Sequence, residues 1–314
     1  MSLHVVATGP LTTVQDLGRP GLAHLGVGRS GAADRPAHRL ANRLVGNPES
    51  AASLETTLAG LTLVTDSPAW VVLTGAPATL LTRAGTIAPG TPAFLPAGSR
   101  VEVGMPPTGL RSYLAVRGGI AVEPVLGSRS TDVLAHLGPP ALAPGTVVAV
   151  GEAPPTWPAP VDHASLPALD PEPTLDLLLG PREDWFDREA LAVLERAPWE
   201  VTAESNRVGV RLAGPPLARA VHEELPSEGM VAGAVQVPPG GRPILVLADH
   251  PVTGGYPVIG VLTAAGLARA AQLRPGTRCR LRVLGAAGGR SGTGARRTLD
   301  APRGGPAGPG ILGR

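Results

Sequence analysis

The chain contains 314 residues, of which 27 are basic and 25 acidic, so its formal net charge is only +2. This balance argues against a nucleic-acid-binding protein, which would carry a clear excess of positive charge. Every basic residue is Arg, and the absence of Lys excludes a Walker A phosphate loop, a Schiff-base lysine and a lysine that could carry biotin.

Glycine (42 residues) and proline (36 residues) are abundant, yet 43% of the residues are hydrophobic, which predicts a folded protein with many turns. Its strand-like segments are short, rich in Val and Leu, and bounded by Gly or Pro. This pattern is typical of β-barrels and sandwiches rather than of alternating βαβ units. The strands that we expect are 3–7, 61–64, 70–74, 100–103, 112–116, 146–150, 175–179, 208–212, 234–237, 244–248, 258–262 and 279–283.

Three short helices should interrupt these strands, at about 34–46, 187–196 and 263–272. In the first, apolar residues recur at helical spacing, with a proline in the first turn and a glycine at the end. Each helix is preceded by a residue whose side-chain oxygen can accept from a free backbone N–H. These expected N-caps are Asp34, Asp187 and Thr263.

The distribution of proline divides the chain. Prolines crowd the segment 152–174, which predicts a stiff, extended connector. We therefore expect an N-terminal β domain at 1–151 and a C-terminal β domain at 175–284. The remaining segment, 285–314, has almost no large apolar residue and is expected to be disordered.

The two halves also echo one another in sequence. The segment 95–101 matches 273–279, and 71–77 resembles 245–251 in the same order. These matches indicate a duplicated β domain, although a strand that ends in a glycine turn also recurs by chance.

The densest polar stretch of the second half runs from 227 to 257. The strands 234–237 and 244–248 flank a tight turn, so we expect Gln236 and Asp249 to meet across a hairpin. The following residues expose backbone N–H groups that suit an anionic oxygen; they are Thr253, Gly254, Gly255 and Tyr256. The alternative is that the glycines only turn the chain, Asp249 caps a turn and Tyr256 packs.

In the first half, Arg19 and Ser30 stand in polar loops that lead to the first helix. Asn42 is a poor residue for a helix interior, so we expect it to make a tertiary hydrogen bond or to contact a ligand. Arg117 ends a strand and could bind a carboxylate through two hydrogen bonds, or form a surface ion pair. The histidines show neither HxH nor HExxH spacing, so we expect no metal site.

The single cysteine, Cys279, lies in an alternating strand-like run and is expected to be a buried thiol rather than a nucleophile. One cysteine cannot form an intrachain disulfide. The first residues lack a basic stretch followed by an apolar one, and no run of 18 apolar residues occurs anywhere. We therefore expect a cytoplasmic protein without a membrane span.

With these residues assembled, the chain resembles the family formed by the C subunits of 5-oxoprolinase. That family is also known as the biotin-dependent carboxyltransferase family, as allophanate hydrolase subunit 2, and as an antagonist of the sporulation-kinase inhibitor. The matching stretches occur in family order and are 13–21, 30–34, 39–47, 54–58, 111–119, 127–132, 205–209 and 227–257. The family usually has two threonines before Gly-Gly-Tyr-Pro, whereas this chain has Val252 and Thr253, so one hydroxyl is missing.

The resemblance implies a mainly β fold of two cyclophilin-like β-barrel domains with a few short helices. It also implies a subunit of an ATP-dependent enzyme that hydrolyses 5-oxo-L-proline to L-glutamate together with the A and B subunits. Because the chain lacks a phosphate loop, we expect ATP to bind mainly elsewhere in the complex. The alternatives are the carboxyltransferase component of a urea carboxylase, with biotin carried by a partner, and a non-enzymatic antagonist of a histidine-kinase inhibitor.

For this chain's share of the chemistry we expect two groups of residues. The candidates for moving a proton or for other catalytic roles are Asp249, Glu228 and Gln236. The candidates for substrate binding are Arg19, Ser30, Asn42, Arg117, Thr253, Gly254, Gly255 and Tyr256, with an arginine on the substrate carboxylate and N–H groups at the glycine pair.

Overall fold

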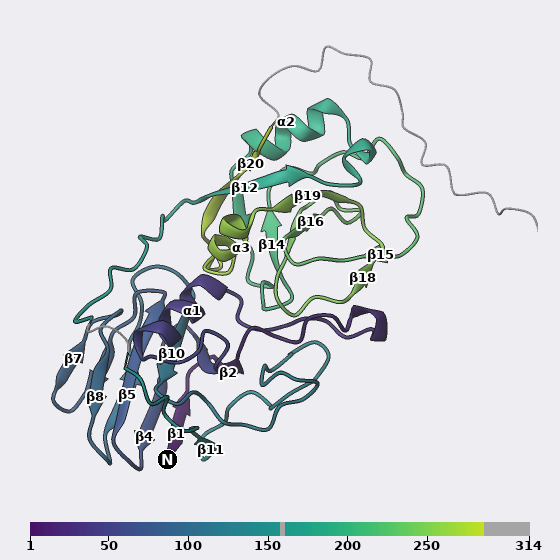
Figure 1. Cartoon of the computed structure of the whole chain (residues 1–314). Coiled ribbons are helices and arrows are strands. Elements are labelled where there is room, and N and C mark those ends of the chain that lie inside the picture. Colours follow the sequence, from purple (N-terminus) through teal and green to yellow (C-terminus); the bar gives the residue numbers. More distant parts are fainter. Residues whose placement is uncertain (158–160, 286–314) are drawn as a thin grey trace, which may run out of the picture. The chain divides into compact units, whose positions relative to one another are not determined.

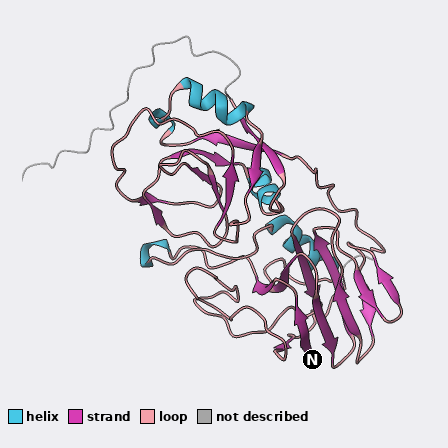
Figure 2. Cartoon of the chain, turned by 180° about the vertical axis from the view of Figure 1, so that it is seen from behind, coloured by secondary structure: helices cyan, strands magenta, loops and turns pink. Residues whose placement is uncertain are grey.

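The structure is a computed structural model that describes residues 1–157 and 161–285. Strands dominate it, and the helices are short (Figure 2). The predicted mainly β fold is therefore confirmed. The expectation of disorder at 285–314 falls, apart from Gly285, on residues outside the described part of the chain.

The first half of the chain forms two antiparallel sheets (Figure 1). The six-stranded sheet consists, in spatial order, of β11 (Val147–Ala149), β1 (Ser2–Thr8), β4 (Leu61–Thr65), β9 (Arg100–Val103), β6 (Leu80–Thr82) and β7 (Gly85–Ile87). The five-stranded sheet consists of β2 (Leu11–Gln15), β3 (Ser53–Thr57), β10 (Arg111–Val116), β5 (Ala69–Gly75) and β8 (Ala93–Leu95). Aliphatic side chains from both sheets, such as Leu3, Leu54 and Leu114, form one buried core.

Helix α1 (Arg35–Leu44) packs on β5 and β10 of the five-stranded sheet. It begins where it was predicted, because the carboxylate of Asp34 accepts a hydrogen bond from the N–H of Ala37 at 3.1 Å. Its inner face buries Ala41 against Val72 and Ala115. The cap fixes the direction in which the loop before Asp34 enters the helix.

The second half forms a closed barrel. Its strands follow one another as β12 (Thr174–Leu179), β19 (Val258–Leu262), β16 (Ala234–Gln236), β17 (Ile244–Val246), β14 (Gly209–Ala213), β13 (Trp199–Val201) and β20 (Arg278–Val283). The parallel pairing of β12 with β20 closes the ring. Trp199 is fully buried in the barrel core beside Cys279, as expected for a strand thiol.

Smaller elements complete the barrel half. Helix α2 (Arg188–Arg196) packs on β20, and α3 (Ala264–Ala270) packs on β12. The short strands β15 (Glu228–Gly229) and β18 (Thr253–Gly254) pair as a separate ribbon. In the described residues, the 3-10 helices are η1 (Ala23–Leu25) and η2 (Glu183–Trp185). No helix in the described residues is both long and apolar enough to span a membrane.

The connector is attached to the first half by Arg117. Its guanidinium donates to the backbone oxygens of Pro154 and Thr156, the latter at 2.9 Å, and lies 3.8 Å from the ring centre of Trp157. A cation over an indole ring and hydrogen bonds to carbonyl oxygens both stabilise the segment. The contacts of Arg117 are thus with the chain itself.

The N-cap of α2 provides a local test of the fold. Replacing Asp187 by Ala removes the acceptor of the Ala190 N–H, now 2.7 Å away. We expect the free energy of unfolding in urea to fall by about 1 kcal/mol. Asp187→Ser, which keeps a capping oxygen, is the control. Equal losses for both variants would contradict the capping role.

Candidate functional site

Two loops of the first half cross at the site. Gly18 and Gly31 both have left-handed backbone angles, with φ of 79° and 94°. A side chain at Gly18 would place Cβ 2.3 Å from the carbonyl oxygen of Arg29, so the loops approach this closely only because the residue is glycine. The N–H of Arg19 donates to the same oxygen at 2.8 Å. The crossing therefore fixes the backbone of Arg19 against 29–31.

A buried ion-pair network joins these loops to the barrel half. The guanidinium of Arg207 forms two hydrogen bonds with Asp249, Nε to Oδ2 at 2.8 Å and Nη2 to Oδ1 at 3.0 Å. Its Nη1 donates to the carboxylate of Glu55 in β3. All three side chains are almost completely buried, with Arg207 only 1% exposed. Charges at this depth are tolerated because each one faces an opposite charge.

The surroundings of Glu55 hold it in the ionised form. Burial alone would raise the pKa of its carboxyl, but Arg207 and Arg111 outweigh burial and lower that pKa below 4.5. The hydroxyl of Tyr113 donates to Glu55 at 2.8 Å, and burial raises the pKa of that phenol well above 10.0. The N–H of Ala33 adds a further hydrogen bond at 3.0 Å. The carboxylate is therefore fully compensated inside the protein.

The structure brings Ser30 and Asp249 together. The Ser30 hydroxyl donates to Asp249 Oδ1 at 2.6 Å, and the N–H of Val133 donates to Oδ2 at 3.1 Å. With the two bonds from Arg207, donors surround the carboxylate of Asp249. This geometry suits a residue that positions loops. Proton transfer by Asp249 stays a prediction.

Beside the loop crossing lies a cavity of about 450 Å³, a size typical of small-molecule sites. Its wall is mostly small and apolar, with no Asp or Glu, and it carries three arginines and one histidine. The lining residues are Arg19, Pro20, Gly21, Leu22, Ala23, Val27, Gly28, Arg29, Ala32, Ala33, Arg35, Met230, Val231, Ala232, Ala248, His250, Val252 and Leu267.

Arg19 is the most unusual of these residues. It is 1% exposed, its Nη2 donates to the carbonyl oxygen of Ser130 at 2.5 Å, and its Nη1 is buried without a hydrogen-bond partner. Within residues 1–157 and 161–285, no carboxylate forms an ion pair with it. A buried guanidinium without a counter-charge is costly. The cavity is therefore suited to an anionic ligand.

Two further arginines add positive charge at this cavity. Arg35 is half-buried, and Arg29 lines the same cavity. Burial, followed by repulsion from Arg29 and Arg39, lowers the pKa of Arg35 to about 10. The Arg35 guanidinium remains charged at neutral pH. An anion between Arg29 and Arg35 would reduce the repulsion between them.

The remaining predicted residues of the second half gather along the β15–β18 ribbon. Glu228 pairs with Gly254 in register and forms an ion pair with Arg182. Gln236 Nε2 donates to the carbonyl oxygen of Tyr256 at 3.3 Å, and the Tyr256 side chain is 45% exposed. The ribbon borders the cavity through Met230, which follows Glu228 and Gly229 in the chain.

The prediction that Gln236 and Asp249 meet is wrong. In the β16–β17 pairing, Gln236 lies opposite Ile244 at the start of β17, whereas Asp249 follows the other end of that strand. A hairpin brings together only residues that share a register, and these two do not. Asp249 joins the loop crossing of the first half instead.

Asn42 and Arg117 lie outside the cavity lining. Asn42 is fully buried, and its amide donates to the carbonyl oxygen of Ala51 at 2.8 Å, which is the tertiary hydrogen bond that we expected as one of two possibilities. Arg117 donates to Val45, Pro154 and Thr156 carbonyl oxygens, as described for the connector. Neither residue has a free group directed at the cavity.

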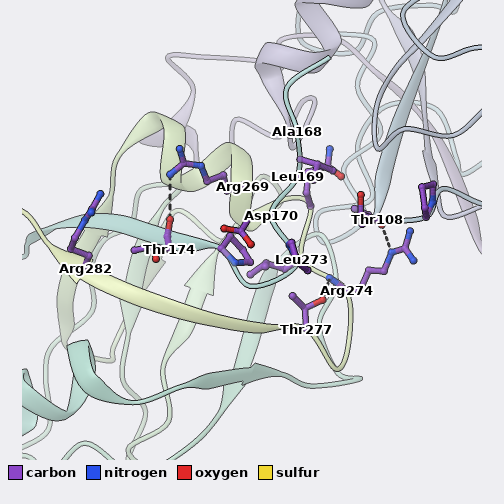
Figure 3. Close-up of a pocket in the computed structure, with 15 residues that line it drawn as sticks. Thr108, Ala168, Leu169, Asp170, Thr174, Arg269, Leu273, Arg274, Thr277 and Arg282 are labelled. Atoms are coloured by element: carbon purple, nitrogen blue, oxygen red, sulfur yellow. Dashed lines mark hydrogen bonds between the residues drawn. The ribbon is translucent and has the colours of Figure 1, made fainter. Parts of the chain in front are cut away.

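A second cavity of about 440 Å³ contains arginines that are occupied by the chain itself (Figure 3). Arg269 donates to the carbonyl oxygen of Thr174 at 3.2 Å, and Arg274 donates to those of Gly109 and Pro106. Arg282 forms an ion pair with Asp176. None of the predicted site residues lines this cavity. It is therefore the weaker candidate.

Comparison with known proteins identifies the family of the chain. Residues 25–283 match the family described as "Carboxyltransferase domain, subdomain A and B". The chain belongs to this family. The resemblance inferred from the motifs is thereby confirmed, and most of the lining of the cavity falls within the matched residues.

This carboxyltransferase-domain protein is 38% identical over 279 residues to the C subunit of 5-oxoprolinase from Escherichia coli, in a match that covers 86% of this chain and 87% of the relative. It is 31% identical over 268 residues to the Haemophilus influenzae protein of the same name, with coverages of 84% and 85%. The structure resembles that of TTHA0988, with a TM-score of 0.82, 36% identity, and coverage of 90% of this chain and 55% of the other.

It also resembles the Kluyveromyces lactis urea amidolyase, with a TM-score of 0.84 and 30% identity, covering 90% of this chain and 19% of the other. The chain thus spans about half of the TTHA0988 chain and about a fifth of the amidolyase chain.

Four residues of this carboxyltransferase-domain protein matter at the site but were not predicted as site residues. Glu55, Arg111 and Arg207 belong to motifs that support the family resemblance, and His250 directly follows Asp249. A signal was available for Glu55, because it is an acidic residue within a strand-like run of leucine and threonine. No local signal could pair it with Arg207, since that contact depends on the tertiary fold.

The ion-pair network predicts a large stability effect. Replacing Arg207 by Met leaves Asp249 buried without a counter-charge and Glu55 with Arg111 alone, and we expect the free energy of unfolding to fall by about 3–5 kcal/mol. The control is Arg211→Met, because Arg211 is exposed and lies 3.7 Å from Glu204, where the loss should stay below about 1 kcal/mol. Urea unfolding measures both. Similar losses for the two variants would contradict the proposed importance of the network.

The lowered pKa of Glu55 predicts a pH dependence. A carboxyl whose pKa is lower in the folded state than in the unfolded state stabilises the fold above its unfolded value, near 4.5, and this stabilisation disappears as the pH falls through the folded value. We therefore expect the stability difference between the wild type and Glu55→Gln to be largest above pH 4.5 and to shrink below it. Urea unfolding from neutral to acidic pH measures this difference, and a constant difference would contradict the prediction.

Proposed function

We propose that the chain is a subunit of an ATP-dependent 5-oxoprolinase, which acts together with A and B subunits to hydrolyse 5-oxo-L-proline to L-glutamate. Two relatives that match most of the chain are named as the C subunit of 5-oxoprolinase. The observation that carries the proposal is that Arg19, which within the described residues has no counter-charge and one unpartnered nitrogen, Nη1, lines a small cavity. 5-Oxoproline has a carboxylate, whereas urea is neutral, so the cavity favours the former.

In this proposal the chain binds and orients the substrate. Arg19, whose Nη1 is buried without a partner, attracts the carboxylate, and Arg29 and Arg35 contribute positive potential at the same cavity. The small apolar residues Ala32, Ala33 and Ala248 leave room for a compact ring and exclude water from it. The Arg207 network keeps both walls of the cavity at a fixed separation, so that orientation costs little on binding.

The cavity does not fit ATP. Its lining contains no lysine and no carboxylate that could hold Mg²⁺ beside a triphosphate. We propose that ATP binds elsewhere in the complex, where it would supply the phosphoryl group that activates the lactam oxygen. This chain would keep the substrate in place for that step.

The decisive experiment reconstitutes the complex. Glutamate release from 5-oxoproline and ATP is measured with this chain copurified with its A and B homologues, and again with this chain omitted. We expect turnover that disappears on omission. Turnover of the same rate without this chain, or none with the full set, would contradict the proposal.

Arg19 provides a sharper test within that complex. Arg19→Gln shortens the side chain and removes the charge, and we expect the KM for 5-oxoproline to rise at least about tenfold, because a charge-assisted hydrogen bond is lost. Arg100→Gln on β9, exposed and away from the cavity, is the matched control. Circular dichroism verifies that both variants fold. An unchanged KM in Arg19→Gln would exclude its role in binding the carboxylate.

A second candidate is the carboxyltransferase component of a urea carboxylase. The likeness to urea amidolyase favours it, with a TM-score of 0.84. Biotin would then be carried by a partner, because this chain has no lysine. Biotin-dependent carboxyl transfer to urea in the reconstituted system tests this alternative directly, and its occurrence without 5-oxoproline hydrolysis would replace the first proposal.

A further inference from the structure

The ring of His250 has its tautomer fixed by one contact. Its Nδ1 lies 2.7 Å from the carbonyl oxygen of Pro251. A carbonyl oxygen can only accept, so Nδ1 carries the hydrogen in this bond. In the neutral ring the other nitrogen, Nε2, is then a bare acceptor.

His250 belongs to the lining of the same cavity as Arg19. His250 lines the cavity and is 8% exposed, and Nε2 has no hydrogen-bond partner in residues 1–157 and 161–285. The backbones are also adjacent, because a side chain at Gly28 would place Cβ 2.9 Å from the His250 carbonyl oxygen. The carbonyl oxygen of the next residue, Arg29, accepts the Arg19 N–H at 2.8 Å. Arg19, whose Nη1 lacks a partner in the described part of the chain, and His250, whose Nε2 lacks one, therefore both line the same small space.

We propose that Nε2 of His250 accepts a hydrogen bond from a ligand N–H, so that the cavity recognises a small carboxylate with an adjacent amide N–H. This inference rests on the proposed function, since it assigns a specificity-determining residue to the same site. In 5-oxoproline the ring N–H is bonded to the carbon that bears the carboxylate. Arg19 would bind the carboxylate, and His250 would bind the neighbouring N–H.

The specificity follows from the cost of an unpaired acceptor. The lactone 5-oxotetrahydrofuran-2-carboxylate has the same shape and charge but an oxygen in place of the N–H. If that ring oxygen faced Nε2, both atoms would be hydrogen-bond acceptors and no hydrogen bond could form. A site built around a hydrogen bond rejects the analogue that lacks it far more strongly than a purely apolar pocket would.

Two substitutions separate this role from a purely structural one. Asn places an N–H near the position of Nδ1, so His250→Asn keeps the bond to Pro251 but loses the acceptor in the cavity. Gln places its amide near the position of Nε2, so His250→Gln keeps the acceptor but loses the bond to Pro251. A ligand-binding role and a structural role therefore predict opposite orders of damage.

The experiment measures KM and kcat/KM for 5-oxoproline in the reconstituted complex, together with inhibition by the lactone and by cyclopentanecarboxylate. We expect the KM to rise about tenfold in His250→Asn and to stay within about threefold of the wild type in His250→Gln. We also expect the wild type to prefer the lactam over the lactone, and His250→Asn to lose that preference.

The inference is overturned if His250→Asn keeps the wild-type KM and the wild-type preference, or if Gln is the more damaging change. It is also overturned if cyclopentanecarboxylate binds the wild type as tightly as 5-oxoproline, in which case the carboxylate site at Arg19 stands and only the N–H recognition fails. Absence of turnover with the wild type in the complete complex would reject the proposed function itself.

Discussion

The guanidinium of Arg207 is the element on which the site depends. It comes from the barrel half, yet it reaches Glu55 in β3 of the first half and Asp249 beyond β17. Asp249 then accepts from Ser30 and from the Val133 N–H. Through this one cation, two loops of the first half and one of the second are held together. Residues beside Ser30 and Asp249, namely Arg29, Ala248 and His250, line the cavity.

The junction between the two halves is polar and specific at a second position too. Gln272 at the end of α3 accepts from the N–H groups of Leu110 and Arg111, and it donates to the Asp34 carboxylate at 2.8 Å. Burial raises the pKa of Asp34, while the bond from Gln272 opposes this. Buried polar contacts of this kind add little net stability compared with apolar packing, but they allow only one arrangement of their partners. The site is thus fixed by matching donors and acceptors.

Local chemistry was enough to predict the helices and most of the strands. Asp34, Asp187 and Thr263 each cap a helix as expected. The segments rich in valine and leucine form strands in both halves. The strands β2 and β3 were not predicted, because their threonines, Gln15 and Glu55 do not form an apolar segment. Those polar residues are buried because tertiary partners satisfy them, and partners distant in sequence leave no periodic signal.

The same limit explains which site predictions failed. Gln236 and Asp249 are close in sequence and both polar, but register and not proximity decides what a hairpin brings together. Arg117 is a plausible carboxylate binder by residue type, yet the connector carbonyls and Trp157 occupy it. Residue type states what a side chain can bind, whereas the fold decides whether anything in the chain already binds it.

Arg19 and Arg207 show how that distinction locates function. Both guanidiniums are 1% exposed, and both come from segments that support the family resemblance. Arg207 faces two carboxylates, so the protein compensates its charge completely. Arg19 has only carbonyl oxygens and one unpartnered nitrogen, and it stands in the wall of a cavity whose lining contains no acidic residue. Among the described residues, the fold thus neutralises the charge of Arg207 and leaves the charge of Arg19 without a counter-charge. Because Arg19 lines a cavity large enough for a small molecule, an anion would be bound most favourably there.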